Sequence, residues 1–491
     1  MSSPLAKPRR GTAAGPVHEH LAGTERPDTA RAVRALPWTW VALLGALTAF
    51  HLVFLVWRIG IPLEVDRNES WNAWHALHAL TPSRLYPKST DLIINNYPPL
   101  SFIFIKLLSF GNDLILVGRI VSLVSVGVIA AGVTDIAEKL GSSRCVAAFA
   151  GLWCFALFAI VVPKYMGMND PNFLALAVMM IGLALFVRDH RRGRVPYMAC
   201  AVMAIALFFK HSIVVLPIVA LVWQYSTRRH LFWRSLVCFA VVGLVGLSIC
   251  RVIYGPEFFE QLLLPRQIRL SSGFRIFRVV PPMLPAMVVW WQWSRLSVPS
   301  EAVAFTKLAL VVALPLNFMQ QCGAGVDYNA TFEFIIVVSI ALGCSLGKTR
   351  PGINPNQSPT QPGLQWTLGA LVILLALCGN RWEPYRFMGS EAYRSAVHRQ
   401  VDVLASEVAR VRALPGRMSC DIFVVCHYAE KAFEFDGFGM HQRVATGVWS
   451  AGRLEHEKRS RGLRFETVSQ AVSWQSTSFQ NSLTAKSEHL R

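Results

Sequence analysis

Three carboxylic acids stand within six residues in the stretch LEVDRNES: Glu64, Asp66 and Glu69. Carboxylates can take the proton of an attacking hydroxyl, and they can also bind a divalent cation. A run with helix-like spacing follows at once and contains Trp71, Trp74, His75 and His78. This pattern predicts an aromatic helix beside an acidic cluster.

Polar and charged residues interrupt apolar stretches at four further places. They are Lys164, Asn169 and Asp170; Lys210 and His211; Arg266, Arg269, Arg275 and Arg278; and Asp327, Tyr328, Asn329 and Glu333. Ionisable groups in or beside a membrane are costly, and this makes them candidates for function. The cations among them suit a bound anion.

The composition indicates a polytopic membrane protein. The 491 residues are 53% hydrophobic and only 16% charged, whereas soluble domains average about 25% charged residues. The net charge of +19 fits basic loops that orient membrane helices, and no zinc-finger or basic-helix pattern supports nucleic acid binding. Residues 1–36 read as a disordered cytoplasmic tail, not as a cleaved signal peptide.

Eleven apolar stretches are candidate membrane spans, within an expected total of about 11–13 helices. They cover 38–60, 114–138, 145–163, 171–187, 195–212, 213–227, 231–251, 281–294, 302–320, 331–347 and 364–380. The stretch PPLSFIFIKLLSF at 98–110 is short, begins with prolines and carries Lys106. We expect it to be a shallow or re-entrant segment.

The distribution of basic residues predicts which loops share a side. The connectors RDHRRGR, RRHLFWR and GKTR are strongly basic and are expected to be cytoplasmic, together with the N-terminal tail. Alternation of the spans then puts the loop 61–97, the four polar clusters and everything after residue 380 on the opposite side. The unusual residues therefore gather on one face of the membrane.

Simpler interpretations exist for most of these residues. Lys210 could snorkel to the interface, Asp170 could cap a helix, and the tryptophans could anchor the chain at the membrane surface. The basic 266–278 loop could bind anionic lipids. His75 and His78 could ligate a metal, but a solvated or capping role is the preferred interpretation. A solvated loop explains the acidic cluster least well.

The segment after residue 380 is expected to be a small α/β domain, and 349–362 a cytoplasmic linker. Residues 383–412 have the pattern of an amphipathic helix, DIFVVCHYA that of a buried strand, and FEFDGFGM that of a strand or turn. The chain is expected to be poorly ordered from about residue 469. Cys420 and Cys426 on one strand would be too far apart to form a disulfide without a bend, and most of the other cysteines lie in apolar stretches.

The order of these motifs resembles that of the GT-C membrane glycosyltransferases, which include protein O-mannosyltransferases and aminoarabinose transferases. EVDRNESWNAWHALHAL followed by NNYPPLSFIFI is similar to their first outer loop, and MNDPN to their second acidic site. CDIFVVCHYAEKAFEFDGFGMHQ resembles a periplasmic segment of bacterial members. The resemblance implies an all-α GT-C-like module at 37–380, a periplasmic domain at 381–491, and a bacterial inner membrane location with the active site facing the periplasm.

The resemblance also implies roles for individual residues. The enzyme would transfer a sugar from a polyprenyl phosphate to an acceptor hydroxyl of a glycan, lipid or protein, with inversion. Asp66 would be the general base, with Glu69 as the alternative or as a group that positions the acceptor, and Asp170 would orient substrate or base. The expected substrate-binding residues are Glu64, Asn96, Tyr97, Lys164, Asn169, Lys210, His211, Arg266, Tyr328, Asn329 and Glu333.

No cofactor is required by this chemistry, although a divalent cation near Asp66 and Asp170 stays open. Membrane lipids are expected partners. A transporter or a lipid-carrier flippase is the main alternative, and a sensor with residues 381–491 as its outer domain is a third. Transporters often show internal repeats and bind near the membrane midplane. The sequence shows no clear repeat, and its polar residues cluster at one face, which favours an enzyme.

Overall fold

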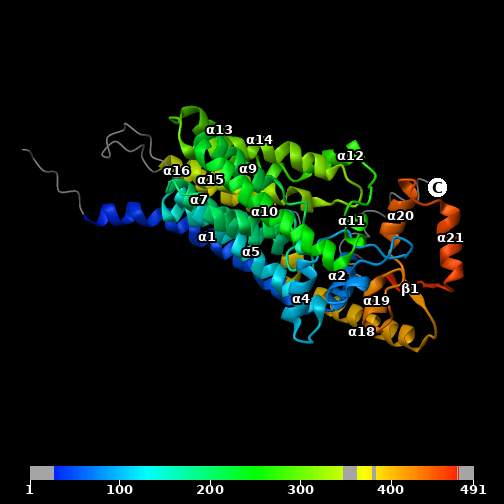
Figure 1. The fold of residues 1–491 in the computed structure, drawn as a ribbon. Helices are drawn as coiled ribbons and strands as arrows, with labels where there is room; N and C mark the ends of the chain where they lie inside the picture. Colours follow the sequence, from blue (N-terminus) through cyan, green and yellow to red (C-terminus); the bar gives the residue numbers. More distant parts are fainter. Residues whose placement is uncertain (1–26, 347–361, 379–382, 473, 475–491) are drawn as a thin grey trace, which may run out of the picture.

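The computed structural model describes residues 27–346, 362–378, 383–472 and 474. It shows a bundle of apolar helices with smaller elements gathered at one end (Figure 1). Seven helices are long and apolar enough to cross a membrane, counting only the described residues. Their spans are Trp38–Ile59 in α1, Leu114–Lys139 (α5), Arg144–Val161 (α6), Pro171–Arg191 (α7), Arg229–Tyr254 (α10), Glu301–Gln321 (α14) and Tyr328–Leu346, which contains η3 (Tyr328–Thr331) and α15 (Phe332–Leu346). The protein is a multi-pass membrane protein.

The other four predicted spans form helices that are shorter than these seven. Their bounds are Tyr197–Ala206 (α8), Val215–Thr227 (α9), Leu284–Leu296 (α13) and Pro362–Cys378 (α16). The segment predicted to be shallow forms α4, Leu100–Ser109. Its 10 residues extend about 15 Å, roughly half the thickness of a bilayer core. Helix α4 is therefore too short to cross, as the sequence predicted.

The first helix begins earlier than the predicted span. Helix α1 extends over Pro27–Ile59, so the expectation of disorder is wrong for residues 27–36. The rest of the predicted tail lies outside the described residues. The same holds for most of the predicted linker at 349–362 and for residues 475–491.

The bundle core forms where α5 packs against α6 and α7. Trp153, Phe149 and Phe158 on α6 are fully buried there. Helix α10 is different, since only 6% of its most apolar window is buried. Its exposed Val241, Leu244 and other apolar side chains are what a helix facing lipid requires.

Short elements cover one end of the bundle, which we term the site end (Figure 1). The loop after α1 supplies α2 (Asn68–Leu77) and α3 (Pro82–Leu85). The connection after α10 supplies α11 (Glu257–Leu262), α12 (Leu270–Gly273), η1 (Phe274–Arg278) and η2 (Pro281–Met283). The C-terminal region packs at the same end, because α19 contacts α2.

The C-terminal region is mostly helical. Its elements are α17 (Glu383–Gly389), α18 (Glu391–Ala413), β1 (Met418–Cys420), α19 (Phe423–Tyr428), α20 (Gly437–Ala445), α21 (Ala451–Ser460), β2 (Arg464–Glu466) and η5 (Gln470–Val472). Strands β1 and β2 pair in parallel, with Ser419 opposite Phe465. The predicted amphipathic helix is present as α17 and α18, and Ser390 caps α18 by accepting a hydrogen bond from the Tyr393 amide.

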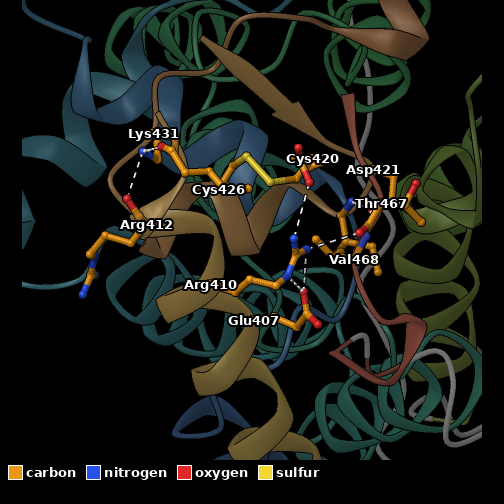
Figure 2. The surroundings of a disulfide bond; sticks show 12 residues. Glu407, Arg410, Arg412, Cys420, Asp421, Cys426, Lys431, Thr467 and Val468 are labelled. Carbon is orange, nitrogen blue, oxygen red and sulfur yellow. Dashed lines mark hydrogen bonds and ion pairs between the residues drawn. A yellow bond between two sulfur atoms is a disulfide. The ribbon is translucent and has the colours of Figure 1, made fainter. Parts of the chain in front are cut away.

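The segment DIFVVCHYA corrects a prediction. It was expected to be a strand, but β1 ends at Cys420 and α19 begins at Phe423. The resulting turn brings the Cα atoms of Cys420 and Cys426 to 5.8 Å, and the two residues form a disulfide (Figure 2). FEFDGFGM likewise leads into a helix, α20, capped by Asp436.

Candidate active site

Asp66 forms the centre of an ionic cluster at the site end. Its Oδ2 lies 2.5 Å from Lys164 Nζ, and the same ammonium lies 3.4 Å from Asp327 Oδ2. The Tyr165 hydroxyl donates to Asp327 at 3.1 Å. Burial lowers the pKa of Lys164, but Asp66 and Asp327 outweigh this effect and leave the pKa raised. The cluster thus joins three segments that are distant in sequence around a permanent cation.

The Asp66 carboxylate is positioned by its own loop as well. Its Oδ1 accepts from the Asn68 amide at 3.0 Å, at the start of α2. The side chain keeps 15% of its surface exposed. Because Asp66 is both oriented and accessible, it can meet a substrate hydroxyl.

Glu69, the alternative base, has a different environment. Its side chain is fully buried, and Arg119 donates to Oε1 from Nε at 2.7 Å and to Oε2 from Nη2 at 2.6 Å. The amides of Val65 and Asn169 also donate to its carboxylate, at 2.8 and 3.0 Å. Four donors occupy this carboxylate, so its geometry suits a structural role.

Arg119 was not singled out from the sequence. From α5 it also donates to the carbonyls of Ile61 and Leu63, at 2.5 and 2.7 Å. It therefore fixes the loop that carries Asp66. The sequence did contain a signal that could have identified it: Arg119 is the one arginine in the apolar stretch 114–138. A charge inside a membrane helix needs a partner.

Asp170 has the capping role that the sequence allowed for it. It is the N-cap of α7 and accepts from the Asn172 amide at 2.8 Å. It is also 7% exposed at the site end. Burial raises the pKa of Asp170, while the charge of Lys210 opposes this shift. Its neighbour Asn169 donates from Nδ2 to the Glu69 carbonyl at 3.1 Å, which connects the two acidic segments.

Lys210 lies in the turn between α8 and α9. Its Nζ stands 3.2 Å from the centre of the Tyr97 ring, a cation–π contact. Burial, opposed by Asp170 and assisted by Arg266, lowers the pKa of Lys210 to about 7. Lys210, Arg266 and Asp170 thus lie within electrostatic reach of one another. His211 next to Lys210 is exposed.

Two acids expected to bind substrate are instead buried by contacts within the protein. Glu64 is 1% exposed and hydrogen-bonded to the Ser70 hydroxyl. Burial raises its pKa to about 8, which leaves it protonated at neutral pH. Glu333 is 3% exposed and accepts from the Leu216 amide at 3.0 Å, which ties α15 to α9.

The other predicted residues lie nearby with varied contacts. Asn96 is half-buried, and it is the adjacent Asn95 that anchors the loop, with its Oδ1 accepting from the Tyr97 amide at 3.0 Å. Asn329 Oδ1 accepts from the Asp327 amide at 3.2 Å. Tyr328 is half-buried beside them.

The C-terminal region closes one side of the site through Asp436, which sequence reasoning left without a role. Its amide donates to the Leu92 carbonyl at 2.8 Å. Burial raises its pKa to about 6, opposed by hydrogen bonds that include one from Trp71. Arg443 donates to the carbonyls of Ser89 and Asp91, each at 2.9 Å. The first loop and the C-terminal region are therefore bonded together.

Two solved structures have a fold similar to that of this chain. The chain superposes on ArnT from Cupriavidus metallidurans bound to undecaprenyl phosphate with a TM-score of 0.58, at 14% identity, over 87% of this chain and 90% of that one. The apo state of that protein gives a TM-score of 0.57 at 14% identity, over 84% and 88%. The protein has a GT-C-like fold. The chain matches no protein-family model and no curated protein sequence.

Within residues 27–346 and the other described parts, no three His, Cys, Asp or Glu side chains group closely enough to hold a metal ion. Between Asp66 and Asp327 the structure instead places the Lys164 ammonium. His75, considered as a ligand, is buried against Trp71 and Phe102.

Proposed function

We propose that this protein is a glycosyltransferase that moves a sugar from a polyprenyl phosphate to an acceptor hydroxyl. The observation that carries the proposal is the presence of an oriented, accessible carboxylate, Asp66, and a buried cation, Lys210, at the same end of a GT-C-like bundle. The solved neighbour that holds undecaprenyl phosphate supports the lipid class of the donor.

Asp66 is the general base in this mechanism. It takes the proton of the acceptor hydroxyl while that oxygen forms a bond to the anomeric carbon of the donor. The Lys164 ammonium keeps the carboxylate in place. Asp170 orients the substrate, and Glu69 acts indirectly, through the bonds with Arg119 that shape the loop.

The bond between the anomeric carbon and the phosphate oxygen breaks in the same step. Its electron pair stays on the phosphate, where fixed cations stabilise the added charge. Lys210 and Arg266 supply these cations, and no strong general acid is needed because the phosphate leaves as an anion. A single displacement inverts the configuration of the sugar.

The proposed setting is the bacterial inner membrane, with the site facing the periplasm. The polyprenyl tail would remain in the bilayer while its head group reaches the site end. The disulfide between Cys420 and Cys426 supports this orientation, because disulfides persist in oxidising compartments such as the periplasm. This chemistry is the same for a hexose and a pentose, and a glycan, lipid or protein hydroxyl can accept the sugar.

A transfer assay in proteoliposomes tests the proposal. The purified protein is given radiolabelled polyprenyl-phosphate hexoses and pentoses together with envelope acceptors. The proposal expects label to leave the lipid for an acceptor and polyprenyl phosphate to accumulate. A flippase would move the labelled lipid between leaflets with the sugar still attached, and that result would contradict the proposal.

A further inference from the structure

Three arginines at the site end have no role in the mechanism described above. They are Arg269, Arg275 and Arg278, which lie in the connection between α10 and α13. No ion pair in the described part of the chain includes any of them. The sequence contains no aspartate or glutamate from residue 261 to residue 300. This connection therefore has positive charge that no acid within the same stretch balances.

Large apolar side chains are exposed in the same connection. The exposed fraction of the side chain runs from 54% at Phe277 to 81% at Ile268, and Leu270 and Phe274 have values between these. The rings of Phe274 and Phe277 lie next to each other, with their centres 6.1 Å apart. Exposed apolar side chains that gather in this way mark a surface for a membrane or a partner. We term residues 268–278 the surface segment.

The surface segment is held at the site end of α14. The Arg269 amide donates to the Cys322 carbonyl at 2.8 Å, just beyond the last residue of this helix. The Phe274 ring packs edge-to-face on Phe318 of α14, with the ring centres 5.4 Å apart. Helix α14 is apolar over most of its length and ends in two glutamines, which is typical of a membrane helix that reaches the headgroup region. The surface segment therefore lies at the level of the membrane surface.

The neighbouring helices indicate that a bilayer covers this surface. Leu284 at the start of α13 and Met319 near the end of α14 are also exposed, so the apolar surface continues from the segment onto two helices of the bundle. Helix α14 is long and apolar enough to cross a membrane, and the exposed side of such a helix faces lipid. The phenylalanines of the surface segment extend this lipid-facing surface to the headgroup region.

The arginines select the kind of lipid. A guanidinium donates two parallel hydrogen bonds to phosphate oxygens and keeps its charge at physiological pH. The bias of basic residues toward the cytoplasm does not explain these arginines, because the strongly basic connectors lie at the end of α7 and the start of α10, at the opposite end of the bundle. A headgroup with a net negative charge does explain them, because it attracts basic residues near the membrane surface.

We propose that the surface segment rests on the bilayer and binds the headgroups of anionic phospholipids in the leaflet at the site end. Its phenylalanines enter the boundary with the acyl chains, and Arg278, which is exposed next to Phe277 in the sequence, contacts the phosphate. Arg275 is already engaged in part, because its Nη2 donates to Ser272 Oγ at 2.9 Å. This inference does not depend on the reaction proposed above.

Site-specific photo-crosslinking identifies the lipid that contacts the segment. The full chain carries p-benzoylphenylalanine in place of Phe277 and is placed in nanodiscs of equal amounts of phosphatidylglycerol and phosphatidylcholine with the same acyl chains. The same probe in place of Val241, an exposed residue in the central, arginine-free part of α10, reports the bulk lipid mixture. Mass spectrometry of the adducts gives the ratio of the two lipids at each position.

The ratio of phosphatidylglycerol to phosphatidylcholine at position 277 should exceed the ratio at position 241 about fivefold, the effect expected of one arginine near an anionic headgroup. Arg278→Gln should remove most of this preference, whereas Arg278→Lys, which keeps the charge, should retain most of it. Arg295→Gln is the matched control and should leave the ratio at position 277 unchanged. Arg295 belongs to the same acid-free stretch, but it packs on Trp291 at the far end of α13.

Other results would overturn the proposal. Lipid adducts at position 241 but not at position 277 would show that the segment does not touch the bilayer. Equal ratios at the two positions, or a ratio at position 277 that is unchanged in Arg278→Gln, would exclude recognition of an anionic headgroup by this arginine. Loss of the phosphatidylglycerol adducts when a small amount of undecaprenyl phosphate is added would assign the arginines to the donor instead of the phospholipid.

Discussion

Asp66 and Glu69 are three positions apart in the sequence, yet their surroundings suit them to different roles. Asp66 is accessible and faces Lys164, whereas Glu69 is enclosed by Arg119 and two backbone amides. Breaking a buried ion pair leaves an uncompensated charge. The two carboxylates can therefore be distinguished by stability, independently of any assay of transfer.

Glu69→Gln should destabilise the protein by about 3–5 kcal/mol, because Arg119 would lose its buried counter-charge. Asp66→Asn should leave the melting temperature near that of the wild type, since an amide can keep the contact with the Asn68 amide. Thermal unfolding of the two purified variants in detergent measures both effects. Equal stability of the two variants would contradict the assigned roles.

Lys210 should make donor binding depend on pH. Its pKa is lowered to about 7 by burial, so the ammonium is present below pH 7 and is lost as the pH rises through that value. Affinity for undecaprenyl phosphate should therefore decrease from pH 6 to pH 8. Lys210→Arg keeps its charge throughout this range and should remove most of the decrease. A wild-type profile that matches the arginine variant would argue against Lys210 as the phosphate ligand.

Helices α5 and α7 position the acidic segments through a close approach. A Cβ atom at Gly118 would stand 1.9 Å from Asn169 Oδ1 and would clash with it. Asn169 donates hydrogen bonds to the carboxylate and the backbone carbonyl of Glu69. Gly127 in the same helix has no heavy atom within 4 Å of such a Cβ. A Gly→Ala substitution can therefore be compared at a position that contacts the site, Gly118, and at one that does not, Gly127.

Gly118→Ala should lower transfer strongly, because Asn169 must move and the Glu69 contacts move with it. Gly127→Ala should retain activity and gain up to about 1 kcal/mol from helix propensity. Parallel transfer assays and melting curves test the pair. Similar activity in the two variants would show that the contact between α5 and Asn169 does not position the site.

The sequence could predict where the helices and the acidic cluster lie, but not how the cluster is bonded. Apolar stretch length predicts membrane helices directly, and the short stretch with Lys106 forms a helix of only 10 residues, α4. The bond between Glu69 and Arg119 joins segments 50 positions apart, and no spacing rule reveals such a pair. It is this bond that separates the two candidate carboxylates.

The C-terminal segment shows a second limit of sequence reasoning. A short apolar run such as DIFVVC fits a buried strand and a buried helix equally well. Its packing against α2 and α18 decides for the helix α19. The helix then bends the chain, so that Cys420 and Cys426 meet, which the expected strand would have prevented.

In the whole molecule, the C-terminal region lies at the same end of the bundle as α2 and α4 (Figure 1). The turn at Gly141 joins α5 to α6, and α5 begins at the site end, where the Asp113 carboxylate accepts a hydrogen bond from Tyr428. Because α5 is long enough to cross the membrane, the turn and the C-terminal region should face opposite compartments.

Epitope tags inserted after Gly141 and after Gly447 test this topology in intact and permeabilised spheroplasts. The tag after Gly447 should be reached by antibody in intact spheroplasts, and the tag after Gly141 only after permeabilisation. Antibody labelling of the Gly141 tag in intact spheroplasts would contradict the proposed orientation. The untagged protein serves as the control for antibody specificity, and a cytoplasmic marker protein serves as the control for membrane integrity.

The central claim is that Asp66 takes the acceptor proton while a polyprenyl phosphate leaves the sugar. Its most direct test is the rate of sugar release from a labelled polyprenyl-phosphate donor in proteoliposomes, compared between the wild type and Asp66→Asn at equal amounts of folded protein. The account predicts acceptor-dependent release by the wild type and a loss of at least about a hundredfold in the variant, the lower end of what a general base contributes. Near-normal turnover by Asp66→Asn would contradict it.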